Sequence, residues 1–101
     1  MGTARYSPLA REDIDAAASY IADENPTAAR RFQSAIQESV NLLVKFPTLG
    51  PAYPHPDHPD LRAKLVSGFK NFVIFYDVRD EQIFVVRVLH AARDIPGVLN
   101  Q

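Results

Sequence analysis

Apolar residues recur at helical spacing in two successive stretches of the first half of the chain. In the first stretch they are Leu9, Ala10, Ile14, Ala17, Ala18 and Ile21, which share one face of a helix. Ser7 before Pro8 is a typical helix start, because serine caps free backbone N–H groups and proline at the first helical position loses no hydrogen bond. The pattern therefore predicts a helix that begins at Pro8.

The pair Asn25-Pro26 separates this helix from a second one. The residue before a proline avoids the helical region, so the first helix ends here, and the same pair can cap and start the next. The second helix has its apolar positions at Ala29, Phe32, Ile36, Val40 and Leu43 and ends at Pro47 and Gly50. With almost no linker between them, the two helices are predicted to form an αα-hairpin.

Three runs of strand-forming residues follow, at Leu61–Val66, Asn71–Val78 and Ile83–Leu89, with turns at Ser67-Gly68 and Asp80-Glu81. The middle run is nearly all apolar, which indicates a central strand covered on both faces, and the short connections predict an antiparallel meander. A short extended stretch at Ala4–Tyr6 precedes the helices. We therefore predict an α+β fold of order β-α-α-β-β-β, with an N-terminal strand and an αα-hairpin packed on a small antiparallel sheet. The 101 residues are expected to form a single domain, 1–101.

The loop from Pro47 to Asp60 holds five prolines, so we expect it to be extended and stiff. It also carries two histidines and two aspartates in six residues, His55 to Asp60, which are possible metal ligands. The interleaved prolines limit their convergence on one point. We therefore expect neither a metal site nor a cofactor.

Composition and charge narrow the possible partners. The net charge is −1, with 5 basic and 8 acidic side chains in the first 60 residues and 6 basic and 4 acidic in the last 41. Proteins that grip nucleic acid through its phosphates usually carry a stronger basic excess. The chain has no cysteine, which excludes disulfides and thiolate sites. It has no apolar run of membrane length and no signal-peptide pattern, so we expect a cytoplasmic protein without membrane contact.

The end of the last predicted strand concentrates the polar chemistry of the chain. Arg87, His90, Arg93 and Asp94 follow one another between apolar residues, and they are candidates for binding a target. A structural interpretation competes with this one. Asp94 would then pair with Arg93 or Arg87, His90 would bond the backbone, and Arg87 would be a solvated strand arginine.

The order of several short motifs resembles the RelE/ParE superfamily of toxins from type II toxin–antitoxin modules. These motifs are Tyr6-Ser7-Pro8, Asn25-Pro26, Phe46–Gly50, Val73–Tyr76 and His90–Pro96. The segment Arg87–Pro96, which contains the last motif, is most similar to the ParE branch. That resemblance implies a toxin that inhibits DNA gyrase by binding it rather than an enzyme, neutralised by a ParD-like antitoxin with a ribbon-helix-helix end. DNA would then be contacted only through the antitoxin or gyrase. Tyr20 and Phe32 are either core residues or lining of an antitoxin groove.

Two alternatives remain open. A RelE-type, ribosome-dependent mRNA endonuclease needs cations at the developing oxyanion and a proton shuttle nearby. Here the catalytic set would be Arg62, Lys64, Arg87, His90 and Arg93, with His90 as the shuttle. The segment after Asp94 contains no other shuttle residue, and the low net charge disfavours RNA. The second alternative is a non-toxic family member that retains antitoxin binding.

Overall fold

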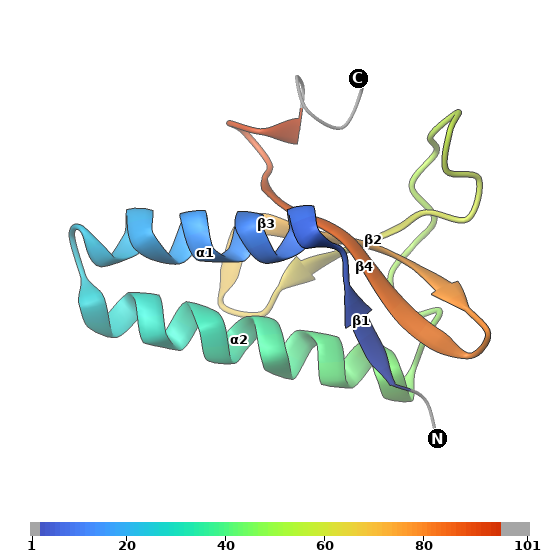
Figure 1. The fold of residues 1–101 in the computed structure, drawn as a ribbon, viewed down its shortest axis with the longest axis horizontal. Helices are drawn as coiled ribbons and strands as arrows, with labels where there is room; N and C mark the ends of the chain where they lie inside the picture. The colour runs from blue at the N-terminus through green and yellow to red at the C-terminus, as the bar shows by residue number, and fades with distance from the viewer. Residues whose placement is uncertain (1–2, 96–101) are drawn as a thin grey trace.

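The computed structural model describes residues 3–95, and the elements follow the predicted order. They are β1 (Ala4–Tyr6), α1 (Pro8–Ala22), α2 (Pro26–Lys45), β2 (Arg62–Val66), β3 (Phe69–Arg79) and β4 (Gln82–His90). Figure 1 shows the two helices side by side, joined by a tight turn and laid against the four-stranded sheet. The predicted α+β architecture is confirmed. Pro96, the last residue of the His90–Pro96 motif, lies outside the described residues.

The sheet differs from the prediction in one respect. Its strand order is β1-β4-β3-β2, and β1 runs parallel to β4, with Ala4 opposite Ile83 and Tyr6 opposite Val85. The strands β2, β3 and β4 form the predicted antiparallel meander. The sheet is therefore mixed rather than antiparallel, because the chain leaves β1 through α1 and returns beside it only at β4, after four intervening elements.

Both predicted helix starts are confirmed. The Ser7 hydroxyl oxygen accepts a hydrogen bond from the Ala10 N–H (2.9 Å), and the Asn25 side-chain oxygen accepts one from the Ala28 N–H (3.0 Å). Ser7 has a second role, because its hydroxyl donates to the Val86 carbonyl on β4 (2.7 Å). The start of α1 is therefore tied directly to the sheet.

The central strand is covered on both faces, as predicted. Side chains Phe72, Ile74 and Tyr76 face the helices, and Val73 and Phe75 belong to a smaller cluster on the opposite face, which Tyr53 of the proline-rich loop covers in part. The β3–β4 hairpin turns at Asp80 and Glu81, both with positive φ (51° and 66°), which suits a two-residue turn that matches the twist of the strands.

The proline-rich loop is anchored to the sheet at Tyr76. The Tyr76 hydroxyl donates to the Pro47 carbonyl (2.9 Å) and accepts from the Gly50 N–H (2.9 Å). A Cβ at position 50 would lie 2.7 Å from the Ala63 carbonyl oxygen and 2.8 Å from the Tyr76 hydroxyl. Glycine is therefore required for the loop to approach β2 and β3 so closely.

Replacing Tyr76 by Phe should lower the free energy of unfolding by about 1–3 kcal/mol, because two backbone groups of the loop lose their buried partner. Burial of the ring raises the pKa of Tyr76, although the Gly50 hydrogen bond opposes the rise. The stability that the neutral hydroxyl contributes is therefore fully present below about pH 10 and is lost as the pH rises through the folded-state pKa.

Urea unfolding at neutral pH and at about pH 11, above the ordinary tyrosine pKa, measures both effects. Tyr53→Phe is the matched control, since its ring packs edge-on against Phe75. Equal stability of Tyr76→Phe and the native chain at neutral pH would contradict the anchoring role.

Candidate functional site

A register shift in the sheet turns Arg87 toward α1. Phe75 of β3 faces Arg87, whereas the next residue, Tyr76, faces Val85. Such a bulge re-aims the side chains beside it. The Arg87 guanidinium meets the Asp13 carboxylate of α1 in two parallel hydrogen bonds, Nε to Oδ2 (2.7 Å) and Nη2 to Oδ1 (2.8 Å). The Val88 N–H also donates to Asp13 Oδ2 (3.1 Å).

The Asp13–Arg87 pair is largely shielded from solvent, with 14% and 19% of the two side chains exposed. The hydrogen bond that Arg87 donates to Asp13 is the main cause that raises the pKa of Arg87, and burial opposes it. Arg87 is therefore a charged, paired residue. The expectation of a solvated strand arginine is wrong, and its hydrogen-bonded partner is Asp13 rather than Asp94.

Sequence reasoning missed Asp13, although a signal was present. Asp13 follows Ala10 by three residues and precedes Ala17 by four, so it lies on the apolar stripe of α1, and both alanines are buried. A carboxylate on a buried stripe requires a partner. The pattern does not say which cation supplies it.

His90 and Asp94 close the turn that follows β4. Asp94 Oδ2 accepts from the His90 N–H (3.0 Å), and His90 Nδ1 accepts from the Ala92 N–H (3.2 Å). The His90 ring also packs edge-on against Phe72, with 5.1 Å between ring centroids. Both side chains thus have local structural contacts, as the structural interpretation anticipated.

Arg93 is the more exposed cation of this region. Its guanidinium lies 4.6 Å from the centre of the Tyr20 ring, and its Nε lies 3.7 Å from Asp94 Oδ1. The Arg93 side chain is 43% exposed, and Tyr20 is 63% exposed. Tyr20 is therefore a surface residue of α1, stacked under a cation.

A groove of about 350 Å³ joins these groups, and we call it the β4-end groove. The residues that line it include Asp13, Tyr20, Phe72, Arg87, Arg93 and Asp94. It brings together three of the four target-binding candidates and one antitoxin-groove candidate. The other groove candidate, Phe32, is fully buried and packs against Phe69 and Phe72. The expectation that Phe32 lines a surface groove does not hold for this structure.

The candidate nuclease residues do not converge on one point. Arg62 Nη1 donates to the Gly50 carbonyl (2.7 Å) and holds the proline-rich loop, and Lys64 Nζ lies 3.4 Å from the Leu65 carbonyl. Both residues are on β2, which β3 separates from β4. Two strand spacings put them about 10 Å from the β4 backbone, and Arg87 is already paired with Asp13.

The loop histidines lie close together, with 5.1 Å between the ring centroids of His55 and His58. Within residues 3–95, no group of three or more histidine, aspartate or glutamate side chains is arranged to hold a metal ion. No helix in the same range is long and apolar enough to cross a membrane.

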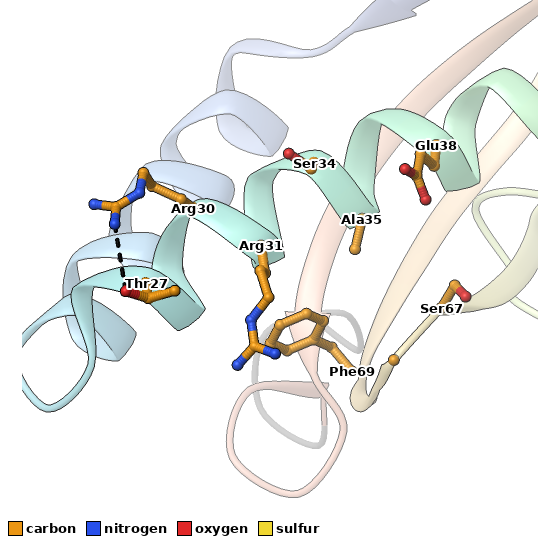
Figure 2. Close-up of a pocket in the computed structure, with 9 residues that line it drawn as sticks. Thr27, Arg30, Arg31, Ser34, Ala35, Glu38, Ser67 and Phe69 are labelled. Atoms are coloured by element: carbon orange, nitrogen blue, oxygen red, sulfur yellow. Dashed lines mark hydrogen bonds between the residues drawn. The ribbon is translucent and has the colours of Figure 1, made fainter.

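Two further grooves of about 570 Å³ each lie away from the β4 end. The first, between α2 and the β2–β3 turn, is polar. Figure 2 shows Arg31 extending beside the Phe69 ring and Arg30 turned back to the Thr27 hydroxyl, to which it donates (3.3 Å). The second is on the opposite face of the sheet, and we call it the apolar groove. Its lining includes Leu49, Pro51, Tyr53, Lys64, Leu65, Phe75 and Ile95.

The fold has a counterpart among solved structures. A chain of the chromosomal ParDE toxin–antitoxin system from P. aeruginosa superposes with a TM-score of 0.72. The two sequences are 21% identical, and the match covers 89% of this chain and 95% of that chain. At this identity the likeness concerns the fold. No curated protein matches the sequence closely enough to count as a relative.

The sequence itself defines the family. The model of the ParE toxin of type II toxin–antitoxin system, parDE, matches residues 4–95. The chain therefore belongs to the ParE toxin family.

Replacing Arg62 by Ala should lower the free energy of unfolding by about 1–2 kcal/mol, because the Gly50 carbonyl loses a charged donor. The matched control is Lys64→Ala on the same strand, which should change stability by less than about 0.5 kcal/mol. Urea unfolding followed by circular dichroism checks both variants. If Arg62→Ala leaves the unfolding midpoint where it is, Arg62 does not hold the loop.

Proposed function

We propose that the chain inhibits DNA gyrase by protein–protein binding through the β4-end groove. A cognate ParD-like antitoxin with a ribbon-helix-helix end neutralises it, and DNA is reached only through gyrase or the antitoxin. This places its action in the cytoplasm. Membership of the ParE toxin family supports the proposal and implies an antitoxin partner.

The observation that carries the gyrase proposal is the exposed pair of Arg93 and Tyr20 beside the β4-end groove. Arginine and tyrosine are the residue types that most often dominate protein interfaces, because each combines a large flat surface with hydrogen-bonding groups. The stacking orients both side chains before a partner arrives, which lowers the entropic cost of binding. This surface suits recognition of a protein.

The nuclease alternative is less well supported by the same contacts. Phosphodiester cleavage needs several cations around one developing oxyanion. Arg62 is engaged with the Gly50 carbonyl and Arg87 with Asp13, on strands that β3 separates. His90 Nδ1 accepts a backbone hydrogen bond, so only its other ring nitrogen remains to move a proton.

The antitoxin is proposed to occupy the apolar groove. Leu49 and Leu65 are each nearly half exposed there, and exposed apolar surface of this extent favours a partner. The Ala63 N–H points outward to the Pro51 carbonyl (3.1 Å). The N–H of Leu65, two residues further along the same edge strand, points the same way beyond the loop. A partner segment can therefore add a strand at Leu65 and place apolar side chains in the groove.

Purified chain should inhibit gyrase supercoiling and leave mRNA on translating ribosomes intact. Arg93→Ala and His90→Ala should weaken inhibition, with the larger loss for Arg93→Ala because its side chain is the more exposed. Lys70→Ala, an exposed cation on β3, is the matched control. Codon-phased cleavage in primer extension, abolished by His90→Ala or Lys64→Ala, would instead assign the chain to the nuclease branch. A folded chain that arrests growth in neither way would be the non-toxic family member.

The antitoxin should stabilise the folded toxin and so raise its melting temperature. At a free antitoxin concentration one hundred times the dissociation constant, the free energy of unfolding should rise by about 2.7 kcal/mol. Leu65→Asp should weaken antitoxin binding and leave gyrase inhibition intact. The control is Leu9→Asp, since Leu9 is an equally exposed leucine on α1. Calorimetric titration measures the antitoxin affinity of both variants. Unchanged antitoxin affinity of Leu65→Asp would refute the placement at the apolar groove.

A further inference from the structure

We infer that Asp13 is a positioning residue for the toxic surface, because it holds the end of β4 in the orientation that presents Arg93 on Tyr20. The inference rests on the gyrase-binding function proposed above. It assigns toxicity a requirement on α1, at a residue that acts through its hydrogen bonds to the end of β4.

The first step concerns the edge of β4. The strand β1 pairs with β4 from Ile83 to Val85. Beyond that point α1 takes over the same edge (Figure 1). The Ser7 N–H donates to the Val85 carbonyl (2.9 Å), the Ser7 hydroxyl donates to the Val86 carbonyl (2.7 Å), and Asp13 accepts from the Val88 N–H (3.1 Å). The carboxylate of Asp13 thus stands where the next strand residue would accept this hydrogen bond.

The second step concerns the chemistry that the position demands. Asp13 Oδ2 accepts from Arg87 Nε and from the Val88 N–H, while Oδ1 accepts from Arg87 Nη2. All three hydrogen bonds need an acceptor on residue 13, and both oxygens of a carboxylate are acceptors. An asparagine would turn its NH₂ group toward one of these donors. The site therefore discriminates between a carboxylate and an amide of the same shape.

The third step links Asp13 to the exposed pair. Tyr20 follows Asp13 by seven residues, which is about two helical turns, so both lie on the same side of α1. Asp13 binds Arg87, and Tyr20 supports Arg93. The helix therefore holds the C-terminal part of the described chain at two points. Without the Asp13 contact, the segment keeps its pairing with β3 and its turn contacts. On the α1 side, only the stacking of Arg93 then remains to orient it, and such stacking is worth little at an exposed site.

The fourth step separates this role from general stability. The apolar groove lies on the sheet face opposite α1 and α2, formed by the proline-rich loop with β2 and β3, and Ile95 is the only described residue of the segment after β4 in its lining. A change at Asp13 alters the β4-end groove, which Asp13 lines, and leaves the apolar groove with its own anchors at Tyr76 and Arg62. Loss of toxicity with retained antitoxin binding is therefore the signature of a positioning role.

The experiment compares Asp13→Asn with Asp15→Asn, an exposed aspartate on the same helix, in the full-length chain. Growth arrest in cells, the concentration that half-inhibits gyrase, antitoxin affinity and melting temperature are measured for each. Asp13→Asn should lose about tenfold or more in gyrase inhibition, the factor that one lost charge-assisted hydrogen bond implies. Its antitoxin affinity should stay within about twofold, and Asp15→Asn should match the native chain.

Gyrase inhibition of Asp13→Asn within twofold of the native chain overturns the inference, and so does an equal loss of gyrase inhibition and antitoxin affinity. Should Asp13→Asn fail to fold, Arg87→Lys decides, because it keeps the charge pair and loses the two parallel hydrogen bonds. Its gyrase inhibition should fall in the same selective way. If the native chain arrests growth without inhibiting gyrase, only the gyrase assignment fails. The inference about Asp13 is then tested by comparing growth arrest among the variants. A native chain that does not arrest growth overturns both.

Discussion

The hydrogen bonds of Asp13 with Arg87 and Val88 are the constraint on which the helix side of this fold depends. They join residues 74 and 75 positions apart, so the first helix and the last strand are held together where β1 no longer flanks β4. A pair that remains partly exposed contributes modestly to the free energy of folding, since desolvation offsets most of the Coulombic gain. Its larger effect is geometric, because two parallel hydrogen bonds allow one orientation of the guanidinium.

A second anchor organises the opposite face. Tyr76 of the central strand binds Pro47 and Gly50, and Arg62 binds Gly50 from the edge strand. These contacts hold the proline-rich loop along β2 and shape one wall of the apolar groove. The two anchors therefore divide the molecule into the β4-end groove, where charged and apolar side chains mix, and the apolar groove across the sheet. The function proposed above assigns these two surfaces to two different partners.

Local signals in the sequence predicted the helices and the meander, because caps, prolines and turn residues act within a few positions. Ser7-Pro8 and Asn25-Pro26 placed both helix starts correctly. The parallel pairing of β1 with β4 and the partner of Arg87 were missed, because each depends on residues more than 70 positions away. Helical spacing placed Phe32 on an apolar face, but it does not tell whether a sheet or a partner covers that face. Arg62 could be interpreted as a catalytic residue because its hydrogen-bond acceptor is a loop carbonyl, and no pattern of side chains in the sequence reveals such a partner.

The distribution of cations limits how such a surface recognises its target. Arg62, Arg79 and Arg87 are each hydrogen-bonded within the part of the chain that the structure describes, to Gly50, Asp77 and Asp13. Arg93 is then the principal exposed charge at the β4-end groove. A single exposed cation at this groove, on a protein of net charge −1, provides little long-range steering, which grows with the summed field of many charges. Under the function proposed above, recognition at this groove has to come from short-range fit around Tyr20 and Arg93, and that fit requires the fixed orientation that α1 gives to the end of β4.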